Sequence, residues 1–202
     1  LSVGVHSNKI RLGHLAGSRF RIKIRGAEEQ AAGPAGRVLE MLQQRGMPNY
    51  FGVQRFGRRG LNSSVGMAVL RYDWKQAVGW LLGCPDDSEN AAVTRARQLF
   101  EAGDAEAAAR AWPTSFDPER RACRAFVRTG GDHEAAWRSL DGRSRRLFLS
   151  AAQSELFNGV LSRRIEQIDR LMDGDVAFKH VNGATFAVDD IAAEQSRCDA
   201  FE

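Results

Sequence analysis

Gly46-Met-Pro-Asn-Tyr-Phe-Gly-Val-Gln-Arg-Phe-Gly57 places three aromatic residues, three glycines, two amides and an arginine within twelve residues. A core strand does not need Asn49, Gln54 and Arg55, and an ordinary loop does not need three aromatic rings. Aromatic rings stack on nucleobases, amides hydrogen-bond to base edges, and a guanidinium binds a neighbouring phosphate. The mixture predicts a pocket for a planar polar ligand. The alternative is a buried turn whose aromatic side chains only pack together.

The part of this segment from Pro48 to Gly57 resembles the signature of the TruD family of tRNA pseudouridine synthases. Two further segments resemble this family, and they follow in the expected order. The basic glycine segment Arg11-Leu-Gly-His-Leu-Ala-Gly-Ser-Arg-Phe20 lies upstream, and Phe148-Leu-Ser-Ala-Ala-Gln-Ser-Glu-Leu-Phe-Asn158 lies downstream. Residues from about 82 to 141 match the family poorly.

The resemblance implies an α/β (α+β) fold, with a mixed sheet, packed helices and a pseudouridine synthase-like catalytic domain. Residues 1–170 would form part of that domain, with a helical insert at about 86–141, and residues 171–202 would begin the inserted second domain of the family. The family's catalytic aspartate lies in an upstream Gly-x-Lys-Asp segment, and this sequence has none. We therefore expect an internal fragment of a larger enzyme, inactive alone because it lacks its nucleophile.

The resemblance also implies a reaction and a set of binding residues. The reaction would isomerise a uridine of tRNA, uridine 13 in this family, to pseudouridine without a metal or an organic cofactor. Asn49 and Phe51 would line the uracil pocket, with Phe51 against the base, while Gln54 and Arg55 would hold the loop or a phosphate. Phe157 and Asn158 would lie behind the pocket. The catalytic residue is not identified in this sequence.

The basic charge is concentrated at the beginning of the chain. Residues 1–60 carry eleven Lys and Arg against three Asp and Glu, whereas residues 61–202 carry eighteen against twenty-two. Clustered cations attract a polyanion such as tRNA. Only four of the 29 basic residues are lysine. The codon usage of a GC-rich genome explains this preference for arginine, but it does not explain why the basic residues gather at the beginning of the chain. The candidates for RNA phosphate contacts are Arg11, Arg19, Arg21 and Lys23.

Other features of the composition favour a cytoplasmic protein without a membrane span. No apolar run approaches the length that a membrane span requires. The three cysteines, Cys84, Cys123 and Cys198, form no Cys-x-x-Cys pair, so neither a disulfide framework nor a zinc site is predicted.

Periodic patterns predict the elements. Residues 18–25 alternate apolar and cationic side chains, which predicts a strand with one buried and one cationic face. Helices are expected at 34–44, from about 62 to 82, and at 144–168, with three or four short helices between 86 and 141. Asn182-Gly183 predicts a hairpin with a two-residue turn within 176–188, followed by a helix capped at Asp189-Asp190.

The helix at 144–168 is expected to be the longest and to bury a broad apolar face that includes Leu156 and Val160. Ser150, Ser154 and Asn158 form a polar row at four-residue spacing within it. The row could support the pocket segment by hydrogen bonds, or it could serve ordinary helix packing.

Two functions of different classes therefore remain. One is an enzyme, a part of a tRNA pseudouridine synthase. The other is a non-catalytic, basic RNA-binding module that keeps the pocket without the chemistry.

Overall fold

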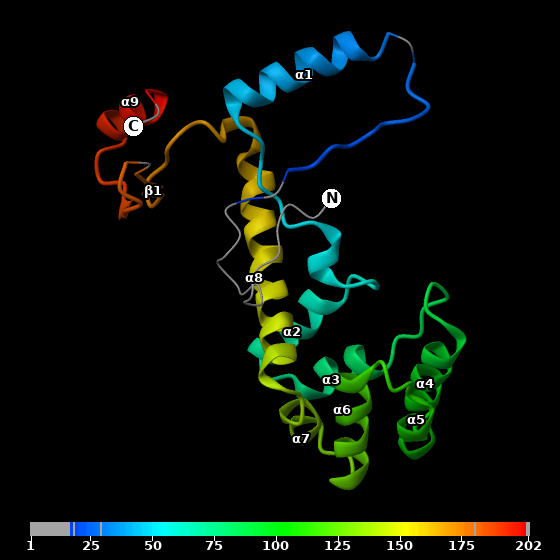
Figure 1. Cartoon of the computed structure of the whole chain (residues 1–202). Coiled ribbons are helices and arrows are strands. Elements are labelled where there is room, and N and C mark those ends of the chain that lie inside the picture. Colours follow the sequence, from blue (N-terminus) through cyan, green and yellow to red (C-terminus); the bar gives the residue numbers. More distant parts are fainter. Residues whose placement is uncertain (1–16, 18, 29, 180, 201–202) are drawn as a thin grey trace, which may run out of the picture. The chain divides into compact units, whose positions relative to one another are not determined.

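The computed structural model describes residues 17, 19–28, 30–179 and 181–200, and it divides into two compact units, Leu1–Met47 and Pro48–Glu202 (Figure 1). The described part is rich in helices and contains a small antiparallel sheet. The predicted α+β class is therefore confirmed.

In the first unit the predicted helix at 34–44 is present as α1 (Ala32–Arg45), and Gly46 ends it with a φ of 76°. The predicted strand is wrong: residues 19–25 are not assigned to a strand, and Phe20, Ile22 and Ile24 are 80%, 81% and 79% exposed. A strand needs a neighbour to bond its backbone, and the only strand pair among the described residues is formed elsewhere. Arg11 lies outside the described residues.

The second unit is a helical assembly followed by a hairpin and a last helix. Its elements are η1 (Val53–Phe56), α2 (Asn62–Leu70), α3 (Trp74–Leu82), α4 (Ala91–Glu101), α5 (Ala105–Ala111), α6 (Asp117–Arg128), α7 (His133–Arg138), α8 (Gly142–Arg164), η2 (Ile165–Gln167), β1 (Val176–Phe178), β2 (Thr185–Ala187) and α9 (Ile191–Asp199).

The prediction of one helix from about 62 to 82 is wrong, because the chain breaks between α2 and α3. Tyr72 adopts a left-handed φ of 59°, which a continuous helix excludes. Asp73 then caps α3, since its carboxylate accepts the N–H of Gln76 at 3.0 Å. The apolar spacing on both sides of the break is helical, so the pattern alone does not reveal the turn.

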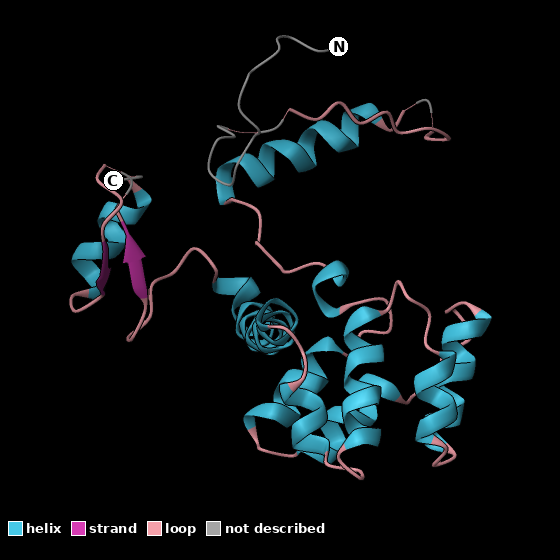
Figure 2. Ribbon diagram, turned by 60° about the horizontal axis from the view of Figure 1, so that its bottom comes forward, coloured by secondary structure: helices cyan, strands magenta, loops and turns pink. Residues whose placement is uncertain are grey.

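Helix α2 lies across α8 at very short range. A Cβ atom on Gly66 would lie 2.2 Å from the carbonyl oxygen of Phe148 and 3.0 Å from the side chain of Ala152. Only a glycine allows the two helices to approach this closely. Figure 2 looks down the axis of α8 and shows helices α2 to α7 gathered to one side of it.

This one-sided packing divides α8 into a buried and an exposed part. Phe148 and Ala152 are buried, as predicted, but Leu156 and Val160 are 58% and 57% exposed. The expected broad buried face is therefore wrong for the second half of the helix, where α2 no longer covers it.

The four short helices α4–α7 confirm the expectation for residues 86–141, and they share one core with α2 and α3. Trp112 and Trp137 are buried, as their apolar character predicts, while Phe100, Phe126 and Val127 pack against the core from its rim. The best-buried members include Val65, Val78, Leu81, Leu82, Val93 and Cys123.

The predicted hairpin is present, with Ala177 of β1 paired to Phe186 of β2. Its turn is longer than two residues, because the innermost bond among the described residues runs from the N–H of Gly183 to the carbonyl oxygen of Lys179, at 2.8 Å. Gly183 adopts a φ of 72° within that turn. The following helix, α9, is capped by Asp190, whose carboxylate accepts the N–H of Ala193 at 3.0 Å, as predicted.

Candidate nucleic-acid interface

The signature segment runs along α8 and forms a single helical turn, η1, between two glycines. Gly57 ends the turn with a φ of 78°, and a Cβ atom there would lie 2.8 Å from the side-chain amide of Asn62. That amide donates to the carbonyl oxygen of Arg55 at 3.4 Å. The conformation of the segment therefore depends on glycine at this position.

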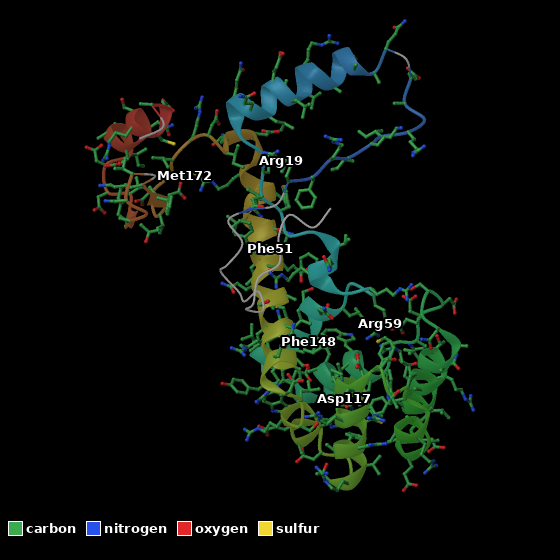
Figure 3. All side chains as sticks on the ribbon, viewed as in Figure 1. Arg19, Phe51, Arg59, Asp117, Phe148 and Met172 are labelled. Carbon is green, nitrogen blue, oxygen red and sulfur yellow. The ribbon has the colours of Figure 1, made fainter. Side chains whose placement is uncertain are left out.

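Asn158 of α8 fixes the backbone of Phe51. Its Oδ1 accepts the N–H of Phe51 at 2.9 Å, and its Nδ2 donates to the carbonyl oxygen of Phe51 at 3.0 Å. Both polar groups of one residue outside regular structure are thus satisfied by one amide. Figure 3 shows Phe51 beside α8.

Phe51 is 38% exposed, so it is not a core residue. Phe157 contacts it in a T-shaped arrangement, with ring centroids 5.5 Å apart. The guanidinium carbon of Arg55 lies 5.0 Å from the ring centroid, within cation–π range. The same guanidinium donates to Ser150 Oγ at 3.0 Å, which anchors it to α8.

The polar row of α8 therefore supports the pocket segment at Ser150 and Asn158, which selects the first of the two interpretations for these residues. Ser154 instead donates to the carbonyl oxygen of Ser150 at 2.7 Å, within its own helix. The row continues to Ser162, whose hydroxyl lies 3.2 Å from that of Tyr50. The four-residue spacing could have revealed Ser162 in the sequence.

The structure thus brings four of the predicted residues together: Phe51, Arg55, Phe157 and Asn158. Asn49 and Gln54 lie in the same segment with exposed side chains. The cationic candidates Arg19, Arg21 and Lys23 are exposed and belong to the first unit.

An open groove of about 580 Å³ lies next to Phe51, because Asn158, which binds the backbone of Phe51, also lines this groove. Val53 and Phe56 contribute apolar surface, and Arg58 and Glu155 contribute opposite charges. A groove with apolar walls and a few polar groups is typical of a small-molecule or nucleotide site.

Arg59 is a structural residue that the sequence pattern did not reveal. Its guanidinium donates to three carbonyl oxygens at the end of α3, those of Trp80, Gly83 and Cys84, each at 3.0 Å. It thereby joins the signature segment to the C-terminal end of a helix, where unpaired carbonyl groups favour a cation. The pair Arg58-Arg59 carries no periodic signal that would distinguish the anchoring arginine from the exposed one.

A second cation near Arg59 is more deeply buried. Arg97 is only 1% exposed, donates to the carbonyl oxygen of Leu81 at 2.7 Å and binds both carboxylate oxygens of Glu89, at 2.6 and 3.1 Å. Its guanidinium also lies 4.9 Å from the ring of Trp112. Burial, and then the charge of Arg97, lower the pKa of Arg59. Glu89 also pairs with Arg59 at 3.6 Å, so charged groups join the helical insert to the chain just after the signature segment.

Two kinds of feature are absent from the described residues. No helix there is long and apolar enough to cross a membrane. No three His, Cys, Asp or Glu side chains in the part of the chain that the structure describes are grouped so that they could hold a metal ion.

Comparison with known proteins points to one family. The model of the family described as tRNA pseudouridine synthase D (TruD) matches residues 1–202. The chain is 44% identical to the tRNA pseudouridine synthase D of Geotalea daltonii and 42% identical to that of Geobacter metallireducens, each over 202 residues. These alignments cover 100% of this chain but 51% and 50% of the relatives, so the chain spans about half the length of the curated relatives it matches.

A solved structure agrees with this result. The crystal structure described as tRNA pseudouridine synthase D (TruD) from Methanosarcina mazei superposes with a TM-score of 0.72 at 27% identity, covering 84% of this chain and 42% of that one. The match of the family model over residues 1–202, the identities above 40% and the shared fold lead to one conclusion. The chain belongs to the tRNA pseudouridine synthase D (TruD) family.

Proposed function

We propose that this chain forms part of a tRNA pseudouridine synthase and contributes its uracil-binding segment. The proposal rests on one observation about Phe51. Asn158 fixes its backbone with two hydrogen bonds, while the residue stays partly exposed. A side chain that only packed would be buried, and a mobile loop would not receive two hydrogen bonds from one amide. A ring held at a fixed position and open to solvent is suited to stack on a base.

The reaction explains why such a ring is needed. Pseudouridine formation breaks the bond between C1′ and N1 of a uridine and rejoins the uracil through C5, so atoms balance without a co-reactant. The uridine must leave its stack to be reached, and the detached uracil must be retained. Phe51 would stack on the uracil, and the exposed amides of Asn49 and Gln54 would bind its polar edge. We do not assign the reacting carboxylate to a residue of this chain.

The remaining expectations concern the RNA and the cell. By family resemblance the target is uridine 13 of tRNA, in the cytoplasm. Arg55 holds the loop through Ser150, which supports the first of its two expected roles. The exposed cations of the first unit would bind the RNA backbone, and the proposed phosphate contacts are Arg11, Arg19, Arg21 and Lys23.

The decisive experiment measures pseudouridine in tRNA. Cells that lack the natural protein containing this chain should lose pseudouridine at one tRNA position, and the purified protein should restore it. Phe51→Ala should lower turnover at saturating tRNA by roughly 5- to 150-fold, the value of one base–aromatic stack. Its loss of stability should stay near 1 kcal/mol, because the ring is partly exposed and loses one aromatic pair.

Leu70→Ala is the control, since Leu70 is an exposed apolar residue at the end of α2 that does not line the groove, and it should leave turnover unchanged. Activity loss that merely follows a large fall in melting temperature would show that Phe51 is a packing residue. A protein that binds tRNA but leaves the pseudouridine map unchanged would instead be the non-catalytic RNA-binding module.

A further inference from the structure

Helix α6 of the insert carries an arginine face that the pocket does not explain. Its arginines at positions 120, 121, 124 and 128 are spaced by three or four residues and therefore lie on one side of the helix. They line a hollow of about 190 Å³ together with Asp117 and Ser139. A hollow of this size surrounded by guanidinium groups suits a phosphate group rather than an apolar ligand.

Part of this face has no counter-charge. Arg120 and Arg121 both pair with Asp117, at 3.6 and 2.9 Å. Arg124 and Arg128 are exposed, and no acidic side chain among the described residues pairs with either. Like charges four residues apart destabilise a helix by about 0.2–0.5 kcal/mol per pair. Arg128 lies in the last turn, where a cation stabilises the helix end, but Arg124 in the middle of the helix has no such role.

Arginines and acidic residues are unevenly distributed over the insert. Residues 86–116 carry three arginines against six acidic residues, whereas residues 117–141 carry five arginines against five. A uniformly high use of arginine would not divide the insert in this way. The arginines of the second half are concentrated on α6, which carries four of them against two acidic residues.

The arginine face lies away from the uracil pocket. Figure 3 shows Asp117, at the start of α6, well apart from Phe51, in the lower part of the helical assembly. Any anion bound there is consequently not the target nucleotide itself. A tRNA is large enough to reach both places, and its backbone offers a phosphate at every nucleotide.

We propose that the arginine face of α6 binds the phosphate backbone of the tRNA at a distance from the target uridine; this inference rests on the proposed function. The planar guanidinium group forms paired hydrogen bonds to phosphate oxygens, which explains arginine on this face. Such contacts position the RNA and add affinity without reading its sequence.

The test compares two double variants of the natural protein that contains this chain. Arg124→Gln with Arg128→Gln removes the two unpaired cations. Arg95→Gln with Arg110→Gln removes an exposed mid-helix arginine and a last-turn arginine from the acidic half of the same insert, with the same change in net charge. Glutamine preserves helix propensity, so both variants should keep the melting temperature of the wild type.

The measurement is the affinity for unmodified tRNA between low and moderate salt. The α6 variant should bind more weakly at low salt, and the slope of log K against log salt should fall by about 1 for each phosphate group that the variant no longer binds, hence by about 2. The control variant should match the wild type. The single variant Arg124→Gln, in the middle of the helix, should show about half of this decrease in slope and guards against an effect on folding.

Two further results separate this inference from the proposed function. Single-turnover pseudouridine formation at saturating tRNA should be unchanged in the α6 variant, because the pocket is intact. Equal salt slopes in both double variants would overturn the inference and would leave an acidic protein as the partner of this face. If the wild type still forms pseudouridine in that case, the proposed function stands. A wild-type protein that binds tRNA with the expected salt slope but forms no pseudouridine would contradict the proposed enzymatic function and would leave the phosphate-binding proposal standing.

Discussion

Asn158 gives Phe51 what a neighbouring strand gives a strand residue: one acceptor and one donor at matched positions. The segment can therefore remain outside regular structure and still have a defined backbone. The partly exposed ring and its contacts with Phe157 and Arg55 follow from this fixed backbone. At the scale of the residue, pre-organisation of the pocket depends on one side-chain amide.

Asn158→Asp tests this arrangement because the two side chains have the same shape. At neutral pH the carboxylate still accepts the N–H of Phe51, but its second oxygen faces the carbonyl oxygen that Asn158 Nδ2 contacts at 3.0 Å in the wild type. We expect a loss of stability of about 1 kcal/mol and a clear loss of pseudouridine formation.

The pH dependence of that variant has a definite sign. Repulsion from the carbonyl oxygen should raise the pKa of the introduced carboxyl above its ordinary value of about 3.9. Protonation supplies the missing O–H donor, so the deficit in the free energy of unfolding should shrink as the pH falls through the raised pKa. Asn158→Ala, which lacks both groups, should show no such recovery. Equal deficits of Asn158→Asp at about pH 8 and about pH 4 would show that the hydrogen-bond pair does not hold Phe51.

Much of this site could be predicted from the sequence, and its limits have physical causes. The aromatic and amide residues of the segment and the polar row on the downstream helix are visible because they depart from the local pattern. Which serine bonds across and which bonds within the helix is decided by the path of the opposing segment. Arg59 was missed because an anchoring arginine and an exposed one look alike without the carbonyl groups that surround them.

Among the elements, the crossing of α2 and α8 determines how closely the pocket segment can approach its support. At Gly66 the two backbones come so close that an added Cβ atom would clash with Phe148, so the missing side chain limits the distance between the helices. The signature segment leads directly into α2, and Asn158 lies further along α8. A change in this crossing should therefore move Phe51 relative to Asn158.

Gly66→Ala should lower the free energy of unfolding by roughly 1–3 kcal/mol, the range for overpacking a well-packed contact. Gly79→Ala is the matched control, because Gly79 is also within a helix but its added methyl group would meet nothing within 4 Å. That change should instead stabilise the protein by about 0.5–1 kcal/mol through helix propensity. Urea unfolding of both variants provides the measurement. Two variants of equal stability would mean that α2 and α8 do not touch at Gly66.

Helical periodicity predicted most of these elements because it reports which side of a helix is apolar. It did not predict the break at Tyr72, since the spacing on both sides of the turn remains helical. It also overestimated burial on the second half of α8, where Leu156 and Val160 are exposed. An apolar stripe shows that a face can be covered, but the covering element must also be long enough to reach it.

For the whole molecule, the predicted division at residue 170 concerns the connection between α8 and the hairpin. Among the described residues α9 has no buried side chain, and each strand of the hairpin has three residues. Arg164 at the end of α8 binds both carboxylate oxygens of Asp175, and Met172 donates its N–H to the same carboxylate at 2.9 Å. This cluster ties the end of the helix to the start of the hairpin.

Asp175→Asn should loosen the tie, because the amide keeps one acceptor where the carboxylate offers two. The Arg164 guanidinium and then the Met172 N–H hold the pKa of Asp175 below its usual range, so the tie is complete above about pH 4 and is lost only as the pH falls through the lowered value. Trypsin cleavage after Arg170, measured near pH 8, should therefore be faster in Asp175→Asn than in the wild type. Asp173→Asn, an exposed neighbour with the same change in charge, should be cleaved at the wild-type rate. If the helices from α2 to α8 remain protected after this cut, residue 170 is a genuine boundary; if they are digested together with the hairpin, the two parts fold as one.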